Sequence, residues 1–294
     1  MMNIRQLRSG DEANLEIFLK SHTDESMFLR SNLYHSGLSY HDKPFHGDYF
    51  ASFDDTKKIT GVLAHYWNGN IIVQCPDFNV LRALVDIFQK SVIREIVGIL
   101  GEEQQADVVI QHLQLKHVDY SVNYPDGLYA LNLQNLAMPG NTDRYKLKEA
   151  KHCEKRLLYE WFRAYHIEAL GAEDDSSMLK DQVKEDVKST LEGNDRWILE
   201  ENGIPVSLCG FNARLPDIVQ IGPVWTPVKL RGRGYARAVV ALSLNAAQKS
   251  GVSRAVLFTN NQAAVRAYQA IGFNKVGNYR LAILKKPIFL KRSL

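Results

Sequence analysis

The sequence predicts an α/β (α+β) protein made of two similar domains, each with a mixed, mostly antiparallel central sheet flanked by helices. Two observations predict this class. The same opening run of strand and helix patterns occurs twice along the 294 residues, although the two halves differ after it, and this length suits two ordinary domains. In the second half strands also alternate with helices, which requires at least one parallel strand pair across a long helix.

In the first half, residues 3–7 predict a short strand and residues 11–22 an apolar-periodic helix. Residues 47–74 then have a strand–turn–strand–turn–strand pattern, with Asp54-Asp55 at the first turn. We expect a helix over residues 81–100. This half has no glycine-rich turn.

The second half opens in the same way. Its strand–turn–strand–turn–strand pattern covers residues 194–220, with Asn202-Gly203 at the first turn, which favours a diverged internal duplication. The other expected elements are a strand at 145–150, a helix at 153–170, a helix at 235–251, a strand at 254–260, a helix at 262–272 and a strand near 278–284.

The best candidate for a linker is Asn135–Arg144, where Pro139, Gly140 and Asn141 break regular structure. We therefore expect domains at residues 1–138 and 143–294. Residues 1–140 hold 11 Lys+Arg and 17 Asp+Glu, whereas the remainder holds 25 and 16. The basic second half predicts an anionic partner there, or simply two domains that differ in surface charge.

Several classes of protein are disfavoured. The basic residues are scattered and form no recognisable nucleic-acid-binding module. No apolar run of about 18 residues is present, so we expect no membrane span. The start of the chain lacks the apolar region of a secretory signal, and its three widely spaced cysteines fit neither a disulfide framework nor a zinc site. A cytoplasmic location is expected.

The turn Arg231–Ala236 lies between an expected strand and an expected helix. Unpaired N–H groups at a helix start, the helix dipole and two arginines all favour a phosphate or pyrophosphate. Arg231, Gly232, Arg233, Gly234, Tyr235 and Ala236 are the candidate binding residues. The P-loop pattern is absent, and Arg237 stands where the dinucleotide fingerprint requires a third glycine.

Two prolines interrupt the preceding strand. Pro223 and Pro227 lack the N–H that pairing on both sides of a strand requires. We expect the strand to part from a neighbour, which would leave backbone groups of Val224, Trp225 and Thr226 for an amide-bearing linear ligand. An edge strand with a bulge is the alternative.

The second half resembles the GNAT superfamily of acyl-CoA-dependent N-acetyltransferases. Its pyrophosphate motif, Arg/Gln-x-x-Gly-x-Gly/Ala, is matched by Arg231, Gly234 and Ala236. A second motif of the family, Asn-x-x-Ala-x-x-x-Tyr-x-x-x-Gly-Phe, is matched by Asn261, Ala264, Tyr268, Gly272 and Phe273. The resemblance covers roughly residues 143–294 and implies acetyl-CoA as co-substrate, with Asn261, Ala264 and Tyr268 among its binding residues. The first half resembles the same fold without the motif, as in a tandem arrangement with a degenerate N-terminal copy.

The resemblance implies direct attack of an amine on a thioester carbonyl. Tyr268 is the expected general acid for the departing thiolate, or a packed core aromatic, and the backbone N–H at Trp225 would polarise the carbonyl. Asn261 would cap a helix, bind the cofactor, or both. No general base is evident: Glu168, Glu200, Glu201 and Asp217 are candidates by type only, and water is an equal alternative. His41 and His46 do not have the spacing of a metal-binding helix, and no metal is expected.

The leading hypothesis is an acetyl-CoA-dependent N-acetyltransferase acting on a primary amine of a small molecule or a protein. A non-catalytic acyl-CoA-binding sensor is the alternative. Aminoacyl transfer from tRNA, which some tandem relatives perform, is disfavoured because a basic stripe is lacking. The acceptor, the acyl chain length and the oligomeric state stay open.

Overall fold

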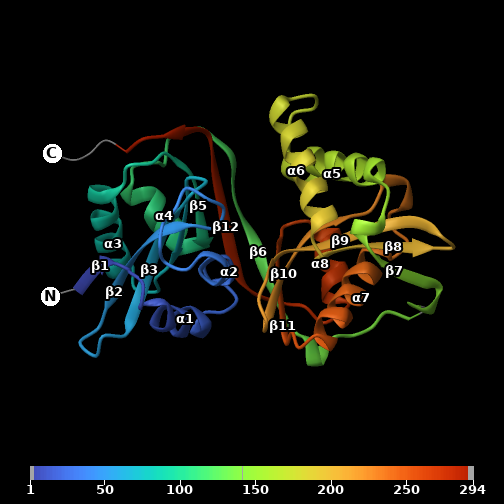
Figure 1. The fold of residues 1–294 in the computed structure, drawn as a ribbon, viewed down its shortest axis with the longest axis horizontal. Helices are drawn as coiled ribbons and strands as arrows, with labels where there is room; N and C mark the ends of the chain where they lie inside the picture. Colours follow the sequence, from blue (N-terminus) through green and yellow to red (C-terminus); the bar gives the residue numbers. More distant parts are fainter. Residues whose placement is uncertain (1–2, 141, 291–294) are drawn as a thin grey trace. The chain divides into compact units, whose positions relative to one another are not determined.

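The computed structural model describes residues 3–140 and 142–290, so Asn141 of the expected linker lies outside the described residues. The first half contains β1 (Asn3–Gln6), α1 (Glu12–Ser21), α2 (Met27–Ser36), β2 (Gly47–Phe53), β3 (Ile59–Tyr66), β4 (Asn70–Gln74), α3 (Phe78–Ser91), β5 (Ile96–Glu102), α4 (Glu103–His112) and β6 (Tyr120–Asn132). The second contains β7 (Tyr145–Glu149), α5 (Lys155–Leu170), α6 (Ser177–Glu192), β8 (Arg196–Glu201), β9 (Ile204–Arg214), β10 (Ile218–Trp225), α7 (Tyr235–Lys249), β11 (Arg254–Thr259), α8 (Gln262–Gln269) and β12 (Asn274–Ile288). Both halves therefore run in the order β-α-α-β-β-β-α-β-α-β (Figure 1).

The chain packs into two compact units. Unit 1 contains the described residues up to Tyr129, Phe258–Asn260, and those from Lys275 onward; unit 2 contains Ala130–Leu257 and Asn261–Asn274. Strand β12 thus belongs to unit 1, although it ends the second half of the chain. The expected division near residues 138–143 stays a prediction, because a compact unit is not necessarily a domain that folds alone.

In both units the strand pairing is mixed and mostly antiparallel, as predicted. The strand order is β1-β2-β3-β4-β5-β12-β6 in unit 1, and the end of β6 continues in unit 2 as β6-β11-β10-β9-β8-β7. Strands β4 and β5 pair in parallel in unit 1, and β10 and β11 do so in unit 2. In both cases a helix, α3 or α7, connects the parallel strands.

The prediction of a helix over residues 81–100 is wrong for the second part of this range. Helix α3 ends at Ser91, and Ile96–Glu102 is strand β5. Val92, at the C-terminal cap, already has extended backbone angles. The β-branched residues that follow fit a strand better than a helix, which the apolar periodicity alone did not reveal.

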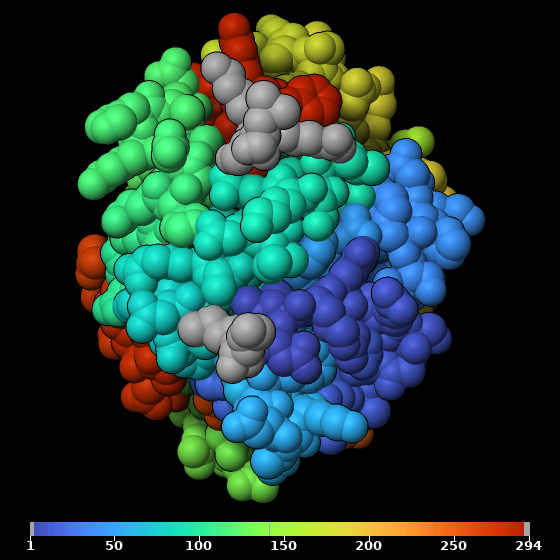
Figure 2. Space-filling view, turned by 90° about the vertical axis from the view of Figure 1, so that its left-hand side faces the viewer, coloured from blue at the N-terminus to red at the C-terminus, as the bar shows by residue number. Residues whose placement is uncertain are grey.

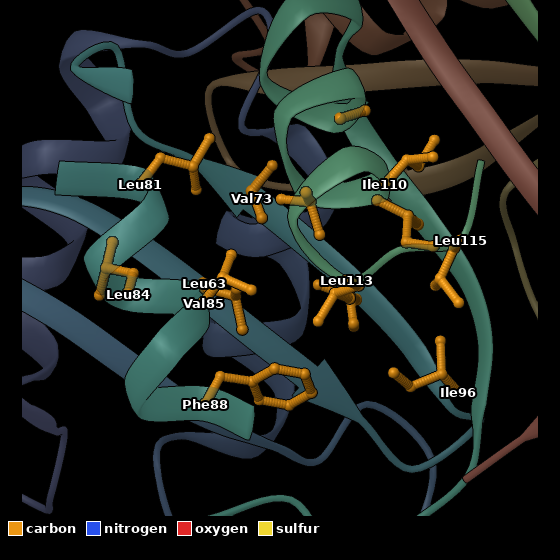
Figure 3. Close-up of a cluster of buried hydrophobic side chains, with 14 of the residues drawn as sticks. Leu63, Val73, Leu81, Leu84, Val85, Phe88, Ile96, Ile110, Leu113 and Leu115 are labelled. Carbon is orange, nitrogen blue, oxygen red and sulfur yellow. The ribbon is translucent and has the colours of Figure 1, made fainter. Parts of the chain in front are cut away.

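One core cluster of unit 1 lies between its sheet and helices α3 and α4. Figure 3 shows Leu81, Leu84, Val85 and Phe88 of α3 directed toward Leu63 and Val73 of the sheet. In Figure 2 the teal part of the chain, which includes α3, forms the outer surface over much of this face. Helices α1 and α2 contact β3 and β4.

In unit 2, helices α5 and α6 pack on one face of the sheet. Trp161 and Phe162 of α5 join Leu208 and Trp225 of the sheet in one buried cluster. The alternation of a strand turns Cys209 to the opposite face, where its Sγ lies 3.3 Å from Ser243 Oγ of α7. No helix in the described part of the chain is long and apolar enough to cross a bilayer.

Candidate active site

Strand β10 separates from β11 part of the way along its length. In the described residues, the parallel register joins only Ile218–Gln220 to β11, whereas β10 stays paired with β9 as far as Trp225. The β9 register is irregular on both sides of Ile221. The separation begins just before Pro223, as the missing proline N–H predicts. Backbone groups of Val224–Thr226 that face β11 are therefore outside this ladder.

The glycine turn ends at the start of α7. Gly234, the N-cap of α7, has φ +84° and no side-chain capping hydrogen bond, and Gly232 has φ +76°. Side chains are disfavoured at such angles, so these two positions require glycine. The first N–H groups of α7 therefore lack the side-chain acceptor that usually satisfies them, which is the environment that an anion stabilises.

Arg231 is fixed by three contacts. Its guanidinium pairs with both carboxylate oxygens of Glu168 on α5, at 2.5 and 3.0 Å. Its Nε donates to the Thr226 carbonyl at 3.0 Å, and its Cζ lies 4.8 Å from the centre of the Trp225 ring. The turn is thus tied to the free end of β10. The sequence could not predict the ion pair, because its partners are 63 residues apart.

Tyr235 and Ala236 form the first turn of α7. The Tyr235 ring is buried, and its hydroxyl donates to Glu201 at the end of β8. This hydrogen bond raises the pKa of Tyr235, while Arg233 opposes the shift. The side chain of Tyr235 therefore anchors the helix, and its contribution to an anion site would come from the backbone.

A hydroxyl pair supports the end of β10. Ser207 Oγ donates to the Trp225 carbonyl at 3.0 Å and lies 2.8 Å from Thr226 Oγ1. Both hydroxyl-bearing residues are buried. Ser207 was not predicted, because a lone serine in a strand carries no sequence signal of such a role.

Asn261 caps α8, one of the two roles expected for it. Its Oδ1 accepts from the backbone N–H groups of Ala263 and Ala264, at 2.9 and 3.1 Å. Capping places Ala264 in the first turn and Tyr268 one turn later. The matched motif therefore has a structural basis in the way α8 begins.

Tyr268 is 7% exposed and packs edge-on against Phe273. Burial raises its pKa well above the ordinary value, and Cys209 on β9 and Tyr165 on α5 raise it further. A phenol in this environment holds its proton at neutral pH and can only donate it. The packing also agrees with the alternative of a core aromatic.

The carboxylates that could act as a base are mostly engaged. Glu168 pairs with Arg231, Glu201 with Arg144 at 3.2 Å, and Glu200 with Lys148 at 3.5 Å. None of these is positioned by a contact that singles it out as a base. Among the described residues, no group of three or more His, Cys, Asp or Glu side chains could hold a metal ion.

The equivalent helix start in unit 1 is different. Asp77, the N-cap of α3, accepts from the N–H groups of Asn79 and Val80 at 2.8 and 3.2 Å. Its carboxylate occupies the end of the helix that an external anion would need. At α7 the same place is held by Gly234, which has no side chain.

Comparison with known proteins agrees with this geometry. The sequence model of the acetyltransferase (GNAT) family matches residues 155–273. An acetyltransferase of Agrobacterium fabrum is 30% identical over 115 residues, which cover 39% of this chain and 72% of that protein. The N-acetyltransferase family 8 member 2 of Rattus norvegicus is 40% identical over 104 residues, or 32% of this chain and 45% of that protein.

The fold resemblance extends beyond the matched segment. A GCN5-related N-acetyltransferase from Sphaerobacter thermophilus superposes with a TM-score of 0.56 at 14% identity, covering 96% of this chain and 94% of that one. The family match and these relatives, with which the parted strands and the glycine turn agree, identify the chain as an N-acetyltransferase. This chain belongs to the GNAT family of acetyltransferases.

Proposed function

We propose that the protein transfers an acetyl group from acetyl-CoA to a primary amine of a small molecule or a protein. The observation that carries this proposal is the joining of two features in unit 2. The α7 start has no side-chain cap, and Arg231 links its turn to the stretch of β10 that has left β11. One feature suits a diphosphate and the other suits the amides of a pantetheine arm.

Different residues of unit 2 would bind the diphosphate and the pantetheine arm of acetyl-CoA. The backbone of Arg231–Ala236 would hold the diphosphate, with Arg233 adding charge. Val224, Trp225 and Thr226 would pair with the pantetheine amides, and the α8 start at Asn261 and Ala264 would line the other side. This assignment leaves Tyr268, in the last turn of α8, to donate from its hydroxyl to the sulfur.

In the reaction, a neutral amine attacks the thioester carbonyl, a C–N bond forms and the C–S bond breaks. The backbone N–H at Trp225 would stabilise the oxyanion, and Tyr268 would give its proton to the departing thiolate. Water would then return a proton to the phenolate, and the excess proton of the amine would pass to solvent. In unit 1, Asp77 supports the proposal that the N-terminal copy is degenerate and binds no acetyl-CoA.

The test combines calorimetry with an activity assay. We expect titration with acetyl-CoA to give one site per chain, and a panel of primary amines to include at least one that releases free thiol. Two sites per chain would contradict the degenerate copy. Tight binding with no thiol release from any amine would replace the enzyme with the sensor.

A further inference from the structure

Unit 1 contains a polar cluster that the acetyl transfer does not use. Gln74 on β4, Glu102 at the end of β5 and Tyr279 on β12 lie on the same face of its sheet, because Val73, Ile99 and Ala282 face the opposite core under α3 and α4. Tyr279 is the direct cross-strand partner of Glu102. Glu25 and Ser26, between α1 and α2, complete the cluster: Glu25 acts electrostatically on Tyr279, and the Gln74 side chain is close enough to Glu25 to lower its pKa by hydrogen bonding.

Several buried polar atoms in this cluster lack a partner. In the described part of the chain, the Tyr279 hydroxyl and the Ser26 hydroxyl close no hydrogen bond, and the Gln74 amide has only its contact with Glu25, which falls short of good hydrogen-bond geometry. Gln74 and Ser26 are completely buried. Unsatisfied buried groups are rare and destabilising, so their grouping in one cluster indicates that something else satisfies them.

Negative charge is concentrated at the same place. Burial raises the pKa of Glu25, the nearby Glu102 raises it further, and the Gln74 amide only partly opposes this. One oxygen of Glu102 accepts from the Gln105 N–H at 3.1 Å. No ion pair within the described residues neutralises Glu25 or Glu102. A bound cation would relieve the repulsion between them.

Three aromatic rings stand beside the carboxylates. Tyr279 stacks on Phe258 with ring centres 4.4 Å apart, and Phe28 lies 5.9 Å from Phe258 and 6.3 Å from Tyr279. Phe28 and Phe258 are only partly buried. Aromatic faces next to carboxylates are the surroundings that organic ammonium ions prefer.

We propose that Glu25, Gln74, Glu102 and Tyr279, with the rings of Phe28 and Phe258, form a binding site for a small organic ammonium ion. The ammonium N–H groups would donate to the Glu25 carboxylate, the Gln74 carbonyl and the Tyr279 hydroxyl. The alkyl part would lie against the rings. All six residues belong to unit 1, so the site is separate from the acetyl-transfer site of unit 2.

The test is calorimetric titration of the full chain with propylammonium chloride, against sodium chloride at equal ionic strength. We expect saturable binding of the ammonium salt alone. Glu25→Gln removes a charge-assisted hydrogen bond and should weaken binding about tenfold or more, and Tyr279→Phe should weaken it about threefold or more. The control Asp55→Asn, an exposed turn carboxylate of unit 1, should leave binding unchanged.

A second readout separates binding from folding. Both Glu25→Gln and Tyr279→Phe should raise the melting temperature of the free protein, because each removes a group that is costly to bury. Three results would contradict the site: no saturable binding heat with propylammonium chloride, the same binding heat in both variants as in the unchanged protein, or the same heat with sodium chloride. If Tyr268→Phe lost the binding and Glu25→Gln kept it, the amine would bind in unit 2, and the proposed site in unit 1 would be wrong.

Discussion

Tyr268 shows how one side chain supports two interpretations. Its burial and its contact with Phe273 would suit a core residue, yet burial also keeps the phenol protonated, as a general acid requires. The structure places it in the last turn of α8, whose first turn is capped by Asn261. Only the effect of the hydroxyl on turnover distinguishes the two.

We expect Tyr268→Phe to lower kcat about a hundredfold, the usual contribution of a positioned proton donor, with the KM for acetyl-CoA within about twofold. The measurement is thiol release at saturating acetyl-CoA. Tyr159→Phe on α5 is the control, since it makes the same chemical change away from the turn. Equal turnover in all three proteins would leave Tyr268 as a packed aromatic.

The ion pair with Arg231 changes the role that we assign to Glu168. By type it was a candidate base, but its carboxylate neutralises Arg231 in the turn. We expect Glu168→Gln to strengthen acetyl-CoA binding up to about fivefold at low salt, because an exposed pair is worth at most about 1 kcal/mol. Titration at two salt concentrations checks this, and the gain should shrink as salt screens the charge.

Weaker binding in Glu168→Gln would show instead that Glu168 holds Arg231 in place for the diphosphate. A large loss of kcat with unchanged binding would return Glu168 to the role of base.

At the scale of elements, the start and the end of α7 provide a matched pair of glycines. Gly234 has φ +84° at the start and Gly251 has φ +100° just after the end. A side chain at either position is strained, so Gly234→Asp and Gly251→Asp should each lower the free energy of unfolding by about 1 kcal/mol.

Only Gly234→Asp should abolish acetyl-CoA binding, because it adds a carboxylate at the proposed diphosphate site. Urea unfolding measures the stability of both variants, and calorimetry measures their binding. Unchanged affinity in Gly234→Asp would remove the diphosphate from this turn, and equal loss in both variants would attribute the effect to helix stability.

The sequence predicted some elements and missed others. Helices α5, α7 and α8 and strand β11 were predicted because each has its own periodicity and its own stop or cap. Strand β5 was not, since an apolar run directly after the apolar face of α3 carries no boundary except its β-branched residues. Helices α2, α4 and α6 and strand β6 were not predicted either.

At the scale of the whole molecule, the last strand of the chain pairs with a strand of the first half. Strand β12 pairs with β5 in unit 1, and the end of β6 stands next to β11 in unit 2. Each unit therefore takes part of its sheet from the other half of the sequence. A cut between residues 138 and 143 would remove β12 from one sheet and the end of β6 from the other.

We expect separate chains of residues 1–138 and 143–294 to be largely unfolded or aggregated, because each would expose an unpaired sheet edge. The two chains expressed together should restore the acetyl-CoA binding of the full protein. Circular dichroism and amide NMR dispersion provide the measurement. A well-dispersed spectrum from 143–294 alone would show that this half is an independent domain.

The sequence alone was enough to predict the shared opening of the two halves, the interruption of β10 by prolines and the glycine turn before α7, because these depend on neighbours a few residues apart. It was also enough for the resemblance to the GNAT family, whose motifs are local. The partner of β12, the Glu168–Arg231 pair and the polar cluster around Gln74 depended on the folded chain. Each joins residues far apart in sequence, and no local preference selects which distant partner completes a sheet, a charge or a buried amide.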